Sequence, residues 1–193
     1  LFRLVGSEMC IRDRDENGDY QFIQSEIKPD AAVKATLYPY QQQGQDLLDV
    51  IISKTDEKLE GDRNVVRAEQ TNLGHLLGEA YRTYDLVNAD FGVMNSGGVR
   101  DSIQAGDIAY RDVLTVQPFG NFVTKATMTG AEVKAYLDVV ATMTAGSGAY
   151  AQLDNISLTV DCDLNDVTIR DINGKGFDLA DTYTFSVISF SAA

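Results

Sequence analysis

Runs of apolar residues, some alternating with polar ones, predict a series of short strands. The clearest alternation is in Tyr183–Phe190, where Tyr183, Phe185 and Val187 fall on one side of an extended chain. Phe91–Met94 is apolar throughout, which predicts a buried strand. The remaining segments with a strand pattern are Tyr20–Ile27, Leu48–Thr55, Phe122–Met128, Asn155–Val160 and Asp166–Asp171.

Helices are expected where apolar residues recur every three to four positions after a capping residue. Thr71 is a good N-cap for one helix, and Thr129 with Glu132 forms a capping box before another. A further helical stretch begins at Pro29-Asp30 and closes at Gly44, and Tyr110–Val116 predicts a short helix or turn. The apolar faces of the two capped helices are expected to be Leu73, Leu76, Leu77, Ala80 and Tyr81, and Val133, Tyr136, Leu137 and Val140.

A glycine turn follows the buried strand and supplies the first candidate site residues. Its sequence, NSGGVR, spans Asn95–Arg100. Gly97 and Gly98 let backbone N–H groups approach a bound anion or ring without a Cβ in the way, and Arg100 adds a forked cationic donor. An ordinary tight turn has the same pattern, so both interpretations stand on this segment alone.

A second loop, Gln117–Asn121, has the sequence QPFGN. Proline stiffens such a loop and glycine lets it turn, so Phe119 can be held out as a flat platform. An aromatic platform stacks on any base, whatever its identity. The alternative interpretation places Phe119 in the core.

Arg63 and Arg67 lie four residues apart. In a helix they share a face, although Val65-Val66 makes an extended segment at least as compatible with the sequence. Two guanidinium groups beside a glycine turn can bind phosphate bidentately. The alternative is a pair of surface cations in an acidic protein.

Composition and charge restrict the classes of partner. With 193 residues and 44% hydrophobic content, the chain can bury one good core, or form one domain plus a fragment of another. A net charge of −13 argues against a nucleic acid polymer, whose phosphates need a basic face, but it allows a small nucleotide if arginines overcome the field locally. No apolar run approaches the ~20 residues of a membrane span. Cys10 and Cys162 define no disulfide framework, and Cys162 is expected to be a free thiol.

His75 is the only histidine. A single histidine cannot build a two-metal hydrolytic centre, and it has no nucleophile or orienting acid at a recognisable spacing. We therefore expect His75 to be an exposed helix residue, and we expect no catalytic or metal-binding residue in this chain.

The first fourteen residues, LFRLVGSEMCIRDR, differ in character from the rest of the chain. Their apolar run is too short for a signal peptide and precedes no small-residue cleavage site. We interpret 1–14 as a non-native segment, the alternative being a strand of an upstream domain.

The glycine turn, the QPFGN loop, the Arg63/Arg67 pair and Thr71–Gly74 (TNLG) together resemble the C-terminal domain of the 5′-nucleotidase/UDP-sugar hydrolase family, from about Asp15 to Ala193. The resemblance implies an α+β fold with a mixed β-sheet and flanking helices. It also implies that 15–28 is the tail of an N-terminal metallophosphatase domain, that 29–44 is an interdomain helix with Gly44 as a candidate hinge, and that 45–193 is a substrate-binding domain truncated at its C-terminal end.

The same resemblance implies roles for individual residues. Phe119 and Phe190 are implied to sandwich the base. Asn95, Gly97, Gly98 and Asn121 are implied to contact the base edge or to form the loop. Arg63, Arg67 and Arg100 are implied to bind anions. The family usually has a third glycine where this chain has Ser96, which leaves the conformation of the turn open. Ser147–Tyr150, in a loop over 142–152, is similar to a family segment near the substrate pocket and receives no role.

The family hydrolyses phosphate esters with two divalent metal ions held by its N-terminal domain. The D-x-H and G-N-H-[DE] signatures of that domain are not in this sequence, so we expect the chain to bind substrate and to hydrolyse nothing alone. The implied parent is a periplasmic or extracellular 5′-nucleotidase, with UDP-sugars as further substrates and its own N-terminal catalytic domain as the partner of this segment. The alternatives are a 2′,3′-cyclic-nucleotide phosphodiesterase/3′-nucleotidase of the same family and a non-catalytic nucleotide-binding module.

Overall fold

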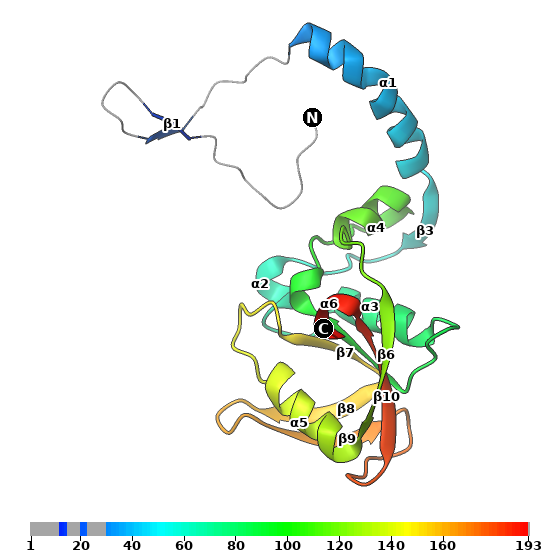
Figure 1. Cartoon of the computed structure of the whole chain (residues 1–193), viewed down its shortest axis with the longest axis vertical. Coiled ribbons are helices and arrows are strands. Elements are labelled where there is room, and N and C mark those ends of the chain that lie inside the picture. Colours follow the sequence, from blue (N-terminus) through cyan, green and yellow to red (C-terminus); the bar gives the residue numbers. More distant parts are fainter. Residues whose placement is uncertain (1–11, 15–19, 23–29, 193) are drawn as a thin grey trace.

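The computed structural model of the chain describes residues 12–14, 20–22 and 30–192 (Figure 1). Its elements are β1 (Arg12–Arg14), β2 (Tyr20–Phe22), α1 (Ala31–Leu48), β3 (Ile51–Thr55), α2 (Arg63–Val66), α3 (Asn72–Thr83), β4 (Phe91–Asn95), the 3₁₀ turn η1 (Ser96–Gly98), β5 (Gly106–Ala109), α4 (Tyr110–Val116), β6 (Val123–Thr129), α5 (Gly130–Val140), β7 (Ala151–Asp154), β8 (Ile156–Asp161), β9 (Asp166–Ile172), β10 (Thr182–Ile188) and α6 (Ser189–Ala192).

The centre of the fold is a four-stranded sheet in the order β6-β10-β4-β7. β10 and β4 run parallel, whereas β6 pairs antiparallel with β10 and β7 pairs antiparallel with β4. Three further antiparallel pairs of described strands, β1–β2, β3–β5 and β8–β9, lie outside this sheet. The mixed sheet with its helices confirms the predicted α+β fold.

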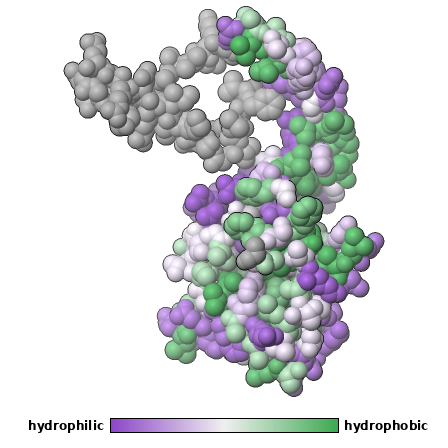
Figure 2. Space-filling model, viewed as in Figure 1, coloured by the Kyte–Doolittle hydropathy of each residue, from purple (hydrophilic) through white to green (hydrophobic). Residues whose placement is uncertain are grey.

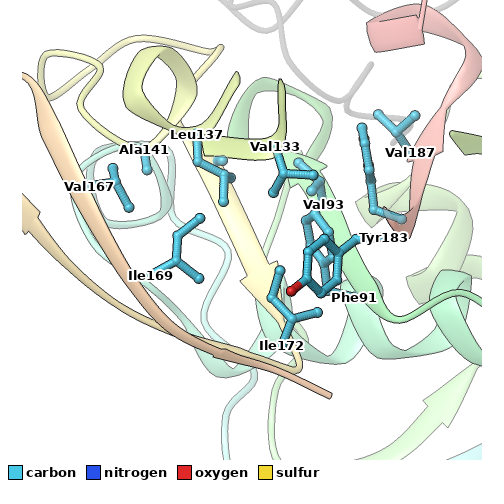
Figure 3. Packing of buried hydrophobic residues seen from close by; sticks show 12 residues of the cluster. Phe91, Val93, Val133, Leu137, Ala141, Val167, Ile169, Ile172, Tyr183 and Val187 are labelled. Atoms are coloured by element: carbon cyan, nitrogen blue, oxygen red, sulfur yellow. The ribbon is translucent and has the colours of Figure 1, made fainter. Parts of the chain in front are cut away.

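The described residues form two hydrophobic clusters, which use different residues of β4. Phe91 and Val93 pack with Val133 and Leu137 of α5 and with the β9 side chains, as Figure 3 shows. Met94 belongs to the second cluster, together with Leu73 of α3 and residues of α2, α4 and β5. Because alternate side chains of a strand point to opposite faces, β4 is covered on both sides, which explains its continuous apolar sequence.

Helix α1 extends from the sheet domain and buries none of its residues (Figure 1). It begins as expected, since the Asp30 side chain accepts hydrogen bonds from Ala32 N at 2.9 Å and Val33 N at 3.0 Å. The predicted end at Gly44 is wrong, because the helix continues to Leu48. A glycine in a helix interior costs only about 1 kcal/mol relative to alanine and does not by itself end a helix.

Apolar side chains are exposed along α1 and at the start of β3, and Figure 2 shows them in green on this arm of the molecule. They are Val33, Leu37, Leu47, Val50, Ile51 and Ile52. Before α1, residues 20–22 of the strand expected over Tyr20–Ile27 form β2, which pairs antiparallel with β1. The β1 residues, Arg12–Arg14, belong to the segment interpreted as non-native. Residues 1–11, 15–19 and 23–29 lie outside the described residues.

Helix α3 has the predicted N-cap, because Thr71 Oγ1 accepts a hydrogen bond from Gly74 N at 3.0 Å. Its buried face differs from the prediction. Leu76 and Ala80 are exposed, whereas Gly74 and Gly78 are buried. A Cβ on Gly74 would lie 2.0 Å from Gln152 Oε1, and one on Gly78 would lie 2.8 Å from Asp154 Cβ. The helix therefore approaches β7 through its glycines, which a hydrophobicity pattern does not register.

Helix α5 has both hydrogen bonds of its predicted capping box, with Thr129 N donating to Glu132 Oε2 at 2.8 Å and Glu132 N to Thr129 Oγ1 at 3.3 Å. The predicted loop over 142–152 is too long by two residues, because β7 begins at Ala151. A strand of four residues has too few positions to show a period, and its pairing with β4 defines it.

The last strand ends at Ile188 rather than Phe190. Ser189 N donates to Phe122 O at 2.8 Å, Ser189 Oγ accepts from Phe122 N at 3.1 Å, and the chain then turns into α6. Phe190 therefore lies on a short helix, not on the predicted strand.

Candidate functional site

A cavity of about 600 Å³ lies where the end of β4, η1, the α4–β6 loop, α5 and α6 come together. This volume suits a small organic ligand. Six of the predicted substrate-binding residues line it, namely Asn95, Gly97, Gly98, Phe119, Asn121 and Phe190. The structure thus brings together residues that are up to 95 positions apart, from 95 to 190. The three predicted anion-binding arginines are not among the lining residues.

Two exposed aromatic rings belong to the cavity wall. Phe119 is 53% exposed and Phe190 is 72% exposed, so neither residue is part of the core. Exposed phenyl rings at a cavity offer flat apolar surfaces on which a heterocycle can stack. The guanidinium carbon of Arg100 lies 5.7 Å from the centroid of the Phe119 ring, within cation–π range.

The glycine turn is held against the segment before β7. Gly97 N donates to Gly148 O at 2.8 Å, Ser96 N donates to Tyr150 O at 2.9 Å, and Ser96 Oγ donates to Ser147 O at 3.1 Å. Since Gly97 N–H is used inside the protein, it is not available for the anion contact that the sequence suggested.

Close packing, rather than an unusual φ, explains the glycines of this turn. A Cβ on Gly98 would lie 2.3 Å from Met94 Cε, and one on Gly97 would lie 3.0 Å from Gly148 Cα. Residues 96–98 have no positive φ. Ser96 therefore adopts the turn without backbone strain, and the turn does not require a third glycine at this position.

The two candidate asparagines differ in how fully they are used. Asn95 Nδ2 donates to Gly148 O at 3.4 Å and its Oδ1 accepts from Ser191 Oγ at 3.3 Å, so both ends of this amide have partners within the protein. Asn121 Oδ1 accepts from Ser189 Oγ at 3.4 Å. Within residues 30–192, the Asn121 amino group has no hydrogen-bond partner, and it can donate to a ligand in the cavity.

Three arginines gather beside the cavity. Arg63 begins α2 and Arg67 is its C-cap, which decides between the helical and extended interpretations of this segment. Arg67 Nη1 donates to Gly146 O at 3.3 Å, and Arg100 Nη1 donates to Gly97 O at 3.2 Å. Burial, and then the charges of Arg63 and Arg100, lower the pKa of the Arg67 guanidinium.

None of these three guanidinium groups forms a salt bridge with a carboxylate in the described part of the chain. The buried Arg67 Nε also has no partner there. Unneutralised positive charge is therefore concentrated at one place in a protein with a net charge of −13. Such a cluster attracts an anion, because binding one relieves the mutual repulsion of the cations.

Sequence reasoning missed part of the cavity wall. Tyr136 and Val140, which were expected only to belong to the apolar face of α5, line the cavity, as do Gly148 and Ala149 of the loop that received no role. The α5 residues share the spacing of the core residues Val133 and Leu137, so periodicity could not separate cavity-lining from core positions. The similarity of Ser147–Tyr150 to a family segment was the one signal that pointed to this loop.

His75 is exposed, as predicted, and its Nδ1 lies 3.4 Å from Oδ1 of Asp154, a buried carboxylate that also pairs with Arg82 Nε. Residues 30–192 contain no group of three or more His, Cys, Asp or Glu side chains placed to hold a metal ion. No helix in the described range is both long and apolar enough to cross a membrane. Cys162 is exposed and is not in a disulfide with any described residue.

The protein is therefore an α+β domain with a cavity of ligand size, which aromatic rings line and arginines border. The chain belongs to the family of the 5′-nucleotidase C-terminal domain, whose family model matches residues 50–193. The family predicted from the motifs is confirmed.

Two curated relatives and one crystal structure illustrate this relationship. The 5′-nucleotidase of Vibrio vulnificus is 55% identical over 172 residues, which cover 89% of this chain and 30% of that protein. Protein UshA of Escherichia coli is 47% identical over 168 residues, covering 86% and 30%. The crystal structure of a 5′-nucleotidase precursor from Thermus thermophilus has a TM-score of 0.71 at 28% identity, covering 83% of this chain and 34% of that chain. The chain thus spans about a third of the length of these proteins.

Proposed function

We propose that this chain is the nucleotide-binding part of a secreted 5′-nucleotidase, which hydrolyses nucleoside 5′-phosphates to nucleoside and phosphate. The observation that carries the proposal is the contact of Arg100 with Phe119, 5.7 Å from guanidinium carbon to ring centroid. It joins an aromatic cavity to a cluster of unpaired cations. A nucleotide fits both the aromatic cavity and the arginine cluster, because one sugar links its aromatic base to its phosphate.

In this proposal the base lies between Phe119 and Phe190, and the Asn121 amino group donates to an acceptor on the base edge. Asn95 both supports the turn and contacts the base edge, since each end of its amide has one partner in the protein and one further hydrogen-bonding position. The phosphate extends toward Arg63, Arg67 and Arg100, whose delocalised charges suit phosphate oxygens. Stacking is insensitive to base identity, which favours a broad range of nucleotides.

The proposal places hydrolysis in the N-terminal domain of the parent protein, where two divalent metal ions would polarise the phosphoryl group and activate a water. Residues 15–28 would be the tail of that domain, 29–44 the segment between the domains, which contains most of α1, and 45–193 the substrate-binding domain. The exposed apolar side chains of α1 agree with a helix that packs on a neighbouring domain. The relatives' family supports a periplasmic or extracellular location, and UDP-sugars are the second substrate class to test.

Titrating the chain with AMP, adenosine and inorganic phosphate tests its binding role. We expect AMP to bind more tightly than adenosine, and this advantage to shrink as salt rises from about 0.05 to about 0.5 M, which shortens the screening length roughly threefold. We expect no phosphate release from AMP by this chain with Mn²⁺, and rapid release by the parent protein. Failure of both AMP and adenosine to bind would refute the binding role, and turnover by the chain alone would refute the division of labour.

A further inference from the structure

The side chain of Gln117 connects two parts of the cavity wall that are distant in sequence. Its Nε2 donates to Gly98 O at 2.9 Å, and its Oε1 accepts from the Tyr81 hydroxyl at 3.2 Å. Gln117 is the C-cap of α4, with its backbone N donating to Val113 O at 2.8 Å, so the residue from which the side chain extends is itself fixed.

Chemistry determines how this amide is oriented. A backbone carbonyl can only accept, so the amino group of Gln117 must face Gly98 O and its carbonyl must face the Tyr81 hydroxyl. That hydroxyl is able to donate because it is protonated, and burial raises the pKa of Tyr81 from its ordinary value. The Tyr81–Gln117–Gly98 chain therefore has one direction of donation and no equivalent flipped form.

This chain of hydrogen bonds lies directly before the Phe119 platform. Gln117 is two residues before Phe119 and four before Asn121, while Gly98 is in the turn that carries Arg100. A second bond in the same place, Arg100 N to Val116 O at 3.1 Å, holds the end of α4 against the turn. This junction connects the loop that carries Phe119 to the glycine turn, and both segments line the cavity.

We propose that Gln117, held by Tyr81, is a positioning residue that sets the Gln117–Asn121 loop at the correct distance from the glycine turn for a nucleoside. Gln117 does not line the cavity, so it acts through Phe119 and Asn121. The inference rests on the proposed function for the nature of the ligand. The loop position itself can be measured without any ligand.

The Gln117→Glu substitution tests whether the hydrogen bond to Gly98 O, rather than the packing of the side chain, positions the loop. Gln117→Glu keeps the shape of the side chain but places an ionised carboxylate against Gly98 O, where neither group can donate. When the carboxyl is protonated its O–H can donate again. Losing one such bond, with a buried carbonyl left unpaired, corresponds to about a 10-fold change in an equilibrium constant.

The experiment uses the full 193-residue chain with two readouts, the dissociation constant for adenosine and backbone hydrogen exchange over 117–122. For Gln117→Glu at about pH 7.5 we expect about 10-fold weaker adenosine binding and faster exchange of the loop. Part of the loss should be recovered as the pH falls through about 4.3, the ordinary pKa of a glutamate carboxyl. Gln117→Ala should weaken binding without recovery at the lower pH. Tyr81→Phe, the mildest change, should produce a smaller loss, and its effect should not add to that of Gln117→Ala.

Gln104→Glu and Tyr84→Phe are matched controls on exposed residues, and both should leave adenosine affinity and loop exchange unchanged. The unfolding free energy of every variant is measured, so that an affinity loss is credited to positioning only where the protein is fully folded. Wild-type loop exchange and affinity in Gln117→Glu and Tyr81→Phe would overturn the inference. If the wild-type chain fails to bind adenosine or AMP, the proposed function falls, and loop exchange in the variants alone decides whether Gln117 positions the loop.

Discussion

Gln152 of β7 and Thr71 at the start of α3 are joined by a buried hydrogen bond, from Thr71 N to Gln152 Oε1 at 2.8 Å. The same amide uses its Nε2 to donate to Val66 O at 2.8 Å and to Glu69 O at 2.7 Å. One fully buried side chain therefore fixes the connection between α2 and α3. Because Arg63 and Arg67 belong to α2 and its C-cap, Gln152 also helps to place the arginine cluster beside the cavity.

Gly74→Ala should disrupt this arrangement. A Cβ there would lie 2.0 Å from Gln152 Oε1, so the amide would have to move and release its buried partners. We expect a loss of about 2–4 kcal/mol in the free energy of unfolding, measured by urea denaturation. Gly44→Ala is the matched control, since Gly44 is also inside a helix but has open space around it. That variant should stabilise α1 by about 0.5–1 kcal/mol, and equal effects of the two changes would contradict the packing argument.

Phe119→Ala should weaken adenosine binding by about 1–3 kcal/mol through the loss of one stacking surface. Isothermal titration of the chain with adenosine measures the change. Phe122→Ala provides the control, because Phe122 is 77% exposed yet does not line the cavity. Unchanged affinity in Phe119→Ala would remove Phe119 from the binding site.

Arg63→Gln should weaken AMP binding while leaving adenosine binding nearly unchanged, because an exposed guanidinium of the cluster contributes to the ligand mainly through the phosphate. The expected loss for AMP is about 1–2 kcal/mol at low salt and less at about 0.5 M salt. Because adenosine lacks the phosphate, its affinity is the internal reference for the affinity of AMP. Arg170→Gln, a change of an exposed arginine on β9, should have no effect on either ligand. An equal loss for both ligands would show that Arg63 does not act on phosphate.

Asp90 should make the stability of the domain depend on pH in the acid range. Burial raises the pKa of this carboxyl, but hydrogen bonds from Thr184 N at 2.9 Å and Thr184 Oγ1 at 2.7 Å, with further donors on Asn173 and Lys175, lower it to about 2 from an ordinary 3.8. The side chain is 22% exposed, so solvent screening of these bonds is limited.

Because the folded-state pKa lies below the unfolded-state value, the ionised carboxylate contributes stability above about pH 4, and this is lost as pH falls toward 2. The contribution at neutral pH is about 2 kcal/mol. Asp90→Asn should be less stable than the wild type by about that amount at neutral pH, and the difference should disappear as the pH falls through about 2. Denaturation curves across the acid range test this, with Asp107→Asn as an exposed control. A stability difference that persists in strong acid would show that the charge of Asp90 is not its cause.

Local sequence signals identified most of the elements in this fold. Thr71 and the Thr129/Glu132 capping box start helices as predicted, because a cap is made by residues three positions apart. The buried β4 was evident from its apolar run. The motifs also selected six residues that share one cavity, although periodicity alone could not have brought positions 95 and 190 together.

The sequence by itself determined the features that depend on a few neighbouring residues. These are the starts of the helices, the buried strand and the types of side chain that can contact a ligand. Tertiary structure decided the rest. β7 exists through its pairing with β4, α3 meets that strand through Gly74 and Gly78, and Tyr136 joins the cavity because α5 packs where it does. Arg67 and Arg100 likewise come together only through tertiary contacts of α2 and the glycine turn. Such contacts link residues tens of positions apart, and their free energy depends on distances that are fixed only when the chain has folded.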